Sequence, residues 1–276
     1  MDLKRVIIFI IGVNLFAWGT PLLISVIAPD NEAISAASVS ISAFGPLIMV
    51  ILIRLIYKET WKDAGLKFGF RNNRNFYYFG LLYPLLLIVL IIIISLIFGT
   101  ADLNSEYPSE LQSILGKMGI FLIPMLSMSI SEEFGWRGYL EPTLRKINKS
   151  ILMNHIIVGI IWGVWHFPIL LFNNPDTGFQ ELLIVLVGCI ALAIVYGQIR
   201  FLSNSVWPCV ILHALSNTFM VAFATSNLLQ IEDPYKDYIS FNTTSIGVTS
   251  LWILTSLVFL AIFYRKRKET TISNKK

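Results

Sequence analysis

Two adjacent glutamates near the end of an apolar segment are the residues of this sequence best suited to chemistry. Glu132 and Glu133 end an apolar run that begins near Met118, and Arg137 follows four residues after Glu133. An ionised side chain inside hydrocarbon costs several kcal/mol, so such residues are rare without a partner or a function. On a helix, Glu133 and Arg137 form an i,i+4 ion pair, whereas Glu132 points about 100° away. We therefore expect Glu133 to be neutralised and Glu132 to remain available.

Two histidines and an asparagine are the polar groups that could face Glu132. His166 lies four residues after Trp162, and Asn217 lies four residues after His213. Each pair therefore shares one face of its helix. We expect these polar side chains to face protein, because exposure to lipid would leave them without partners.

The depths of these groups in the membrane agree. Glu132 lies eight residues before Leu140, and His213 lies eight residues after Ser205, which places each about 12 Å from the cytoplasmic end of its span. His166 lies ten residues after Ile156, which places it about 15 Å deep. Together with the asparagine, these groups predict a polar active-site cavity in the cytoplasmic leaflet.

Glycines on the span of His166 favour close helix packing. Gly159 and Gly163 form a small-xxx-small pair on the side of His166, and such pairs let a second helix approach closely. His155 lies beside the basic residues of 145–149, so we expect it at the membrane interface.

Composition identifies the class of protein. The 276 residues have a mean hydropathy of +0.71, and 14% are charged, whereas about a quarter of a soluble domain is charged. Several apolar runs reach the roughly 20 residues that cross a bilayer as helix. The first run has no clear small-residue cleavage site, so we expect a retained helix. The sequence predicts an all-α polytopic membrane protein, a single integral domain over 1–276, with about eight transmembrane helices near 6–28, 37–57, 77–99, 118–140, 152–172, 181–199, 205–224 and 246–264.

The loops between these spans alternate in charge. The 58–76 loop carries five basic residues and the 141–151 connection carries three, whereas the 225–245 loop is mainly acidic. The positive-inside rule then places both termini in the cytoplasm. The net charge of +4 reflects this topology, and we expect no nucleic-acid partner.

Together the motifs resemble the three-motif signature of the CPBP family. This family is also called the Abi or CAAX-protease family and includes the type II CAAX prenyl endopeptidases. The resemblance covers a core of about 118–224 and is carried by Glu132-Glu133-xxx-Arg137, Trp162-xxx-His166 and His213-xxx-Asn217. Trp162 stands where many members carry phenylalanine. The resemblance implies an intramembrane endopeptidase of a prokaryotic cell membrane, whose partners are membrane lipid and a peptide or lipidated protein substrate.

The resemblance also implies a catalytic role for each motif. Glu132 and His166 would activate a water, His213 and Asn217 would stabilise the oxyanion, and the ion pair of the first motif would support them. The substrate would be a membrane-associated protein, prenylated or of bacteriocin type. A positioned carboxylate base and amide or imidazole donors suit peptide hydrolysis.

Glu132, His166 and His213 are also candidates for a zinc site. Two histidines and a glutamate form a three-ligand catalytic zinc set, and family members are often labelled metalloproteases. However, the sequence has no His-Glu-x-x-His motif, and metal binding would compete with the use of Glu132 as a base. We favour a reaction without a cofactor, and Zn²⁺ stays open as the alternative.

Other functions stay open as well. The polar residues could form a network that holds helices together, or a proton relay in a transporter, although the sequence has no inverted or parallel repeat. A third alternative is a membrane immunity or binding protein. Cys209 lies four residues before His213, so a Cys–His nucleophile is a further alternative. The sequence does not determine the oligomeric state.

Overall fold

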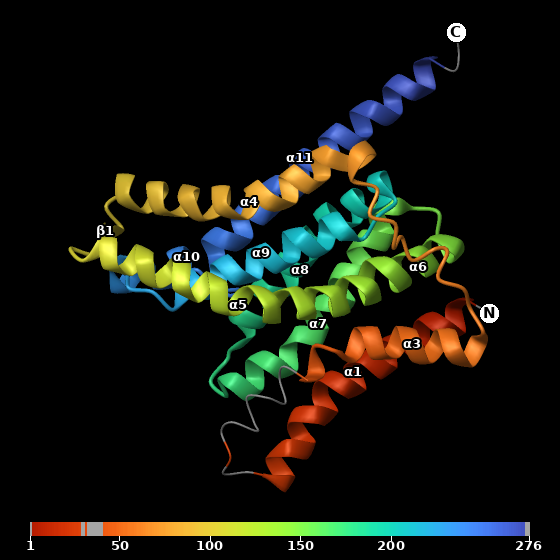
Figure 1. Ribbon diagram of the computed structural model, residues 1–276, viewed down its shortest axis with the longest axis horizontal. Coiled ribbons are helices and arrows are strands. Elements are labelled where there is room, and N and C mark those ends of the chain that lie inside the picture. Colours follow the sequence, from red (N-terminus) through yellow and green to blue (C-terminus); the bar gives the residue numbers. More distant parts are fainter. Residues whose placement is uncertain (1, 29–30, 32–40, 274–276) are drawn as a thin grey trace.

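The computed structural model describes residues 2–28, 31 and 41–273 of the chain, which form a helical bundle with one small sheet (Figure 1). The main helices, in chain order, are α1 (Asp2–Ile27), α3 (Gly45–Tyr57), α4 (Phe70–Ile97), α5 (Tyr107–Gly135), α7 (Ile151–Asn173), α8 (Phe179–Ser203), α9 (Trp207–Ala224) and α11 (Ile246–Ser273). Shorter helical segments are the π-helical turn η1 (Trp136–Leu140), α6 (Glu141–Ile147), the 3₁₀ turn η2 (Asp233–Tyr235) and α10 (Lys236–Ile239).

All eight predicted spans correspond to helices, and the predicted all-α polytopic membrane fold is confirmed. Within the described residues, six helices are long and apolar enough to cross a membrane, and one of them is the continuous helix Tyr107–Ile147. Two predicted spans are shorter apolar helices, Gly45–Tyr57 and Ile246–Ile262. Thirteen helical residues extend only about 20 Å, less than the hydrocarbon thickness of about 30 Å. The predicted count of eight is thus supported for six helices, and residues 37–40 of the second predicted span lie outside the described part.

The close contact predicted from the glycines of α7 is present against α8. A Cβ on Gly159 would lie 2.6 Å from Cα of Ile190, and one on Gly163 would lie 3.0 Å from Cα of Leu186. Because real Cβ atoms are rarely or never found at such distances, the two glycines allow the helix backbones to approach this closely. This contact fixes the depth and rotation of α7, and so the position of the second motif.

The basic loop after α3 is fastened to the adjoining ends of α8 and α9. Arg200 donates from Nη2 to the carbonyl oxygen of Asp63 at 2.8 Å, and Trp207 donates from Nε1 to that of Leu66 at 2.8 Å. Gly65 lies between them with φ of 73°, a conformation that favours glycine. This end of the bundle also carries α6 (Figure 1).

The opposite end of the bundle carries a two-stranded antiparallel sheet (Figure 1). Strand β1 (Ala101–Leu103) follows α4, and β2 (Leu229–Ile231) follows α9. The sheet therefore ties together the two connections that carry many of the acidic loop residues.

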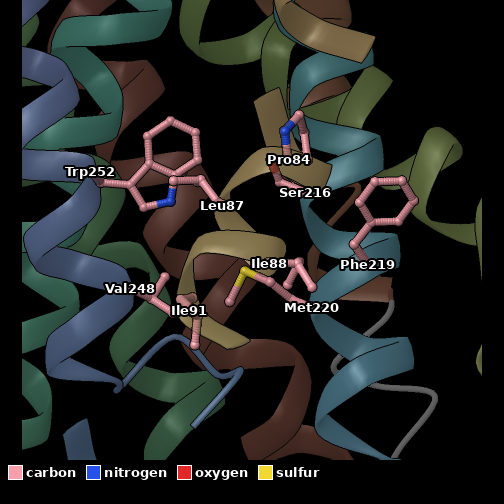
Figure 2. Close-up of a pocket in the computed structure, with 9 residues that line it drawn as sticks. All are labelled: Pro84, Leu87, Ile88, Ile91, Ser216, Phe219, Met220, Val248 and Trp252. Atoms are coloured by element: carbon pink, nitrogen blue, oxygen red, sulfur yellow. The ribbon is translucent and has the colours of Figure 1, made fainter. Parts of the chain in front are cut away.

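A small apolar cavity lies between α4, α9 and α11 (Figure 2). Its volume of about 20 Å³ is room for about one water. Ser216 supplies the hydroxyl of its wall, and the other lining residues are Pro84, Leu87, Ile88, Ile91, Phe219, Met220, Val248 and Trp252. None of these is a predicted site residue. This cavity is therefore not the polar one expected from the sequence, which stays a prediction.

Candidate active site

The paired glutamates lie in the last turn of α5, directly before a π-helical turn. Glu132 is 3% exposed and Glu133 is fully buried. The π-turn η1 begins at Trp136 and contains Arg137, and single π-turns are frequent at functional sites. The backbone carbonyl of Arg137 accepts a hydrogen bond from Nε of Arg200 at 3.1 Å, so α8 holds this turn in place.

Glu133 is bound by two partners through one oxygen. Arg137 donates from Nη1 to Oε1 of Glu133 at 3.0 Å, and both side chains are fully buried. His213 on α9 lies with Nδ1 2.9 Å from the same oxygen. The ion pair predicted from the i,i+4 spacing is confirmed. The contact with His213 was not predicted.

Glu132 has a different and uncharged hydrogen-bond partner. Trp162 on α7 donates from Nε1 to Oε2 of Glu132 at 2.8 Å. From the sequence, Trp162 was predicted only as the aromatic position of the second motif. The signal that could have found this contact is the presence of an indole donor one turn before His166, on the helix face expected to meet Glu132.

Both histidines are held through Nδ1. Nδ1 of His166 lies 2.8 Å from the backbone oxygen of Trp162, and Nδ1 of His213 lies 2.9 Å from the carboxylate of Glu133. Because a carbonyl or an ionised carboxylate can only accept, Nδ1 carries the proton in both rings. A neutral ring of His166 then presents the Nε2 lone pair for proton transfer, whereas a protonated ring of His213 can donate from Nε2.

The indole ring of Trp162 lies close to the rings of both histidines. The centre of its ring system lies 5.7 Å from that of His166 and 5.5 Å from that of His213. Both imidazoles also interact electrostatically with the carboxylate of Glu132. The structure therefore groups Glu132 with both histidines at the interface of α5, α7 and α9.

Asn217 lies one helical turn after His213 on α9 and is half-buried. Within the described part of the chain, no hydrogen bond joins its carboxamide to another residue. Its amide is thus available to a ligand, although only the helix spacing places it beside the other groups.

Comparison with known proteins covers this region of the chain. Residues 114–219 match the family model described as type II CAAX prenyl endopeptidase Rce1-like. The predicted resemblance to these endopeptidases is confirmed. The protein named CAAX prenyl protease 2 of Methanococcus maripaludis is 31% identical over 94 residues. That alignment covers 34% of this chain and 34% of the relative, so the similarity spans about a third of either protein. The Rce1-like segment contains all the residues of the three motifs.

The described residues of the Rce1-like segment are not grouped as a zinc site requires. Among the described residues, no group of three or more His, Cys, Asp or Glu side chains is placed to hold a metal ion. The candidate zinc ligands Glu132, His166 and His213 are among the residues for which this holds. One oxygen of Glu132 is turned toward the indole of Trp162. We therefore derive no catalytic step through a metal.

Cys209 is not oriented as a partner of His213. Its Sγ donates to the backbone oxygen of Tyr196 at 3.3 Å. Cys209 is also fully buried, and it is not part of a disulfide bond among the described residues. The geometry does not support the Cys–His nucleophile considered from the sequence.

His155 is buried inside the protein, a position that its predicted place at the membrane interface did not anticipate. Its side chain has no exposed area, and Nδ1 lies 3.2 Å from Oε1 of Glu141. Gly197 on α8 provides the space, since a Cβ there would overlap the imidazole ring. The basic neighbours of His155 in sequence suggested an exposed residue, but a buried acid from α6 supplies a partner inside the protein.

Proposed function

We propose that the chain is an intramembrane endopeptidase that uses Glu132 and His166 to activate water. The observation that supports this proposal is that the carboxylates of the two glutamates have different partners. Glu133 is bound by a guanidinium and an imidazole, whereas Glu132 accepts from a neutral indole and interacts with two imidazoles. Glu132 is thus the carboxylate that can still accept a proton.

The proposed reaction begins with proton transfer from water to Glu132. The hydroxide attacks the scissile carbonyl carbon, and the carbonyl oxygen becomes an oxyanion. His166 orients the water through Nε2, because its Nδ1 is engaged with the carbonyl of Trp162. Protonated Glu132 then returns the proton to the leaving amine as the carbon–nitrogen bond breaks.

His213 and Asn217 are proposed to stabilise the oxyanion. The Glu133 carboxylate at Nδ1 of His213 stabilises the protonated ring, whose Nε2–H can then donate. The amide of Asn217 supplies a second donor. Each well-placed donor to an oxyanion contributes about 3 kcal/mol to the barrier.

The proposed substrate is a peptide or lipidated protein at the membrane. The name of the Methanococcus relative, CAAX prenyl protease 2, supports a prenylated substrate, and a bacteriocin-type peptide is the other candidate. We also propose that the single domain over 1–276 is a multi-pass protein of a prokaryotic cell membrane with both termini in the cytoplasm. Basic residues at the α6 end and acidic residues near β1 and β2 support this orientation.

The test is cleavage by the purified protein under single-turnover conditions, with prenylated and unprenylated membrane peptides. Glu132→Gln keeps the shape of the side chain and removes the base, so we expect the rate to fall by about 10²-fold or more. His166→Ala should behave similarly, and the double variant should be little worse, because residues that act as a unit are not additive. Glu106→Gln changes an exposed glutamate and should cleave at the wild-type rate.

Two results would overturn this proposal. Cleavage by Glu132→Gln at the wild-type rate removes Glu132 as the base. Failure of the wild-type protein to cleave any of these peptides favours a binding or immunity protein, or a transporter if the protein carries a proton-coupled flux in liposomes.

A further inference from the structure

Trp162 makes two hydrogen bonds that join the proposed base to its histidine. Its indole N–H donates to Oε2 of Glu132 at 2.8 Å. Its backbone oxygen accepts from Nδ1 of His166, also at 2.8 Å. The side chain is 2% exposed, so no bulk water competes for these bonds.

The indole ring is held on several sides, which fixes the direction of its N–H. The guanidinium carbon of Arg137 lies 4.5 Å from the centre of the ring, a cation–π contact. The ring of His213 meets it edge-on, with centroids 5.5 Å apart. Tyr196 packs beside it at 5.9 Å. Trp162 cannot turn away from Glu132 without breaking these contacts.

We propose that Trp162 is the positioning residue of the base, holding Oε2 of Glu132 so that Oε1 takes the proton from water. Within the described residues, Oε2 is the oxygen of Glu132 that accepts a hydrogen bond. An N–H donor favours the ionised form of a carboxylate over the protonated form. Trp162 therefore sets the direction in which the carboxylate of Glu132 points. This inference rests on the proposed function of Glu132.

Other titratable groups also act on Glu132. His166 on α7, Cys189 on α8 and His213 on α9 interact electrostatically with it. Glu133 and Arg137 lie in the same stretch of helix. A substitution of Trp162 leaves these groups in place. A difference in pH dependence between the variant and the wild type therefore reports the effect of the indole.

The chain offers a matched control for the substitution. Trp162→Phe keeps an aromatic ring and removes the donor. Trp165→Phe removes a second indole from α7, 1% exposed, whose Nε1 has no hydrogen-bond partner among the described residues. Both changes remove similar volume from the same helix, but only the first removes a hydrogen bond.

The first measurement is the pH dependence of kcat/KM for the wild type and both variants. Losing a donor to the ionised carboxylate should move the acidic limb of the Trp162→Phe profile upward by roughly one to two pH units. Cleavage should fall more at acidic pH than on the alkaline plateau, and KM should stay near its wild-type value. Trp165→Phe should keep the wild-type profile. A Trp162→Phe profile that superimposes on that of the wild type overturns the inference.

The second measurement needs no cleavage and separates this inference from the proposed function. Infrared difference spectra between acidic and neutral pH contain the protonated carboxyl band of Glu132, identified by its loss in Glu132→Gln. Its midpoint should move upward in Trp162→Phe and stay unchanged in Trp165→Phe. If the midpoint moves in Trp162→Phe but the wild-type protein never cleaves a peptide, only the proposed function is refuted. If the midpoint does not move but the wild-type protein cleaves, only the proposed role of Trp162 is refuted.

A third measurement avoids any change at Trp162, in case Trp162→Phe does not fold. In ¹⁵N–¹H spectra of the indole groups, the Trp162 signal should shift when Glu132→Gln is introduced, because its acceptor changes from a carboxylate to an amide. The Trp165 signal should move less. Equal shifts of the two signals would contradict a specific bond between Trp162 and Glu132.

Discussion

Arg137→Ala tests the buried ion pair that separates the two glutamates. The side chains of Arg137 and Glu133 are fully buried, and their charged atoms lie 3.0 Å apart. Removing one partner of a buried pair costs about 3–5 kcal/mol, because the other charge stays buried without it. The change also removes the guanidinium from the rings of Trp162 and Tyr196, at 4.5 and 4.8 Å. Each such contact contributes about 1 kcal/mol. We expect the free energy of unfolding to fall by at least about 3 kcal/mol.

A double-mutant cycle separates the charge from the packing. In Glu133→Gln with Arg137→Met both charges are removed together, and neutral replacements of a buried pair are often tolerated. We expect the double variant to be more stable than Arg137→Ala, with a coupling energy above about 1 kcal/mol. Unfolding in detergent by heat or denaturant, followed by tryptophan fluorescence, measures each variant. Arg71→Ala changes an exposed arginine and should alter stability by no more than about 0.5 kcal/mol.

One outcome would refute this reasoning. If Arg137→Ala unfolds with the wild-type free energy and still loses all turnover, the guanidinium acts in the reaction and is not a structural partner of Glu133. Partial loss of turnover together with lower stability agrees with the pairing, because the unpaired carboxylate of Glu133 would disturb the adjacent Glu132, the proposed base.

Three further predictions concern the rest of the molecule. Gly197→Ala should lower the free energy of unfolding by about 1–3 kcal/mol, because the added Cβ would overlap the buried imidazole ring of His155. In the control Gly116→Ala the added Cβ has nothing within 4 Å, so this variant should be neutral or stabilising. Equal losses of stability in the two variants would contradict the overlap. Asp63 lies in the loop after α3, where burial raises its pKa but hydrogen bonds to Arg54 and Lys146 prevail and lower it. Its stabilising contribution is therefore complete above pH 4 and is lost as the pH falls toward the lowered value; acid titration of stability should show a weaker dependence in Asp63→Asn. Peptide cleavage should be unchanged by a metal chelator, and a loss of rate restored by added Zn²⁺ would favour the zinc alternative.

The helices could be predicted from the sequence, because an apolar segment that crosses a membrane must satisfy its backbone hydrogen bonds internally, and a helix does so. The α7 span was predicted at 152–172 and is observed at Ile151–Asn173. The start of α5 was placed at 118, but the helix begins at Tyr107. The apolar pattern reports the part of a helix that lies in hydrocarbon. It carries no information about polar helical turns beyond it, and those turns lengthen both α4 and α5.

The partners of the site residues were predictable only within one helix. The i,i+4 rule identified Glu133 with Arg137, since both positions follow from a single helical period. The contacts of Glu132 with Trp162 and of Glu133 with His213 join different helices. They depend on how each helix is rotated about its axis, and interhelical packing sets that rotation. The π-turn after Gly135 also changes the rotation of α6, so Glu141 as the partner of His155 could not be deduced from a regular period.

The adjacency of the two glutamates has a physical consequence that either residue alone would lack. Consecutive residues on a helix point about 100° apart, so two acids at the same depth meet different neighbours. Glu133 faces α9 and the following π-turn, where it binds His213 and Arg137. Glu132 faces α7, where the indole of Trp162 donates to it. Had the acids been four residues apart, one guanidinium could have reached both. The spacing of one residue therefore lets a single helix carry an ion-paired acid, Glu133, beside the acid proposed as the base, Glu132.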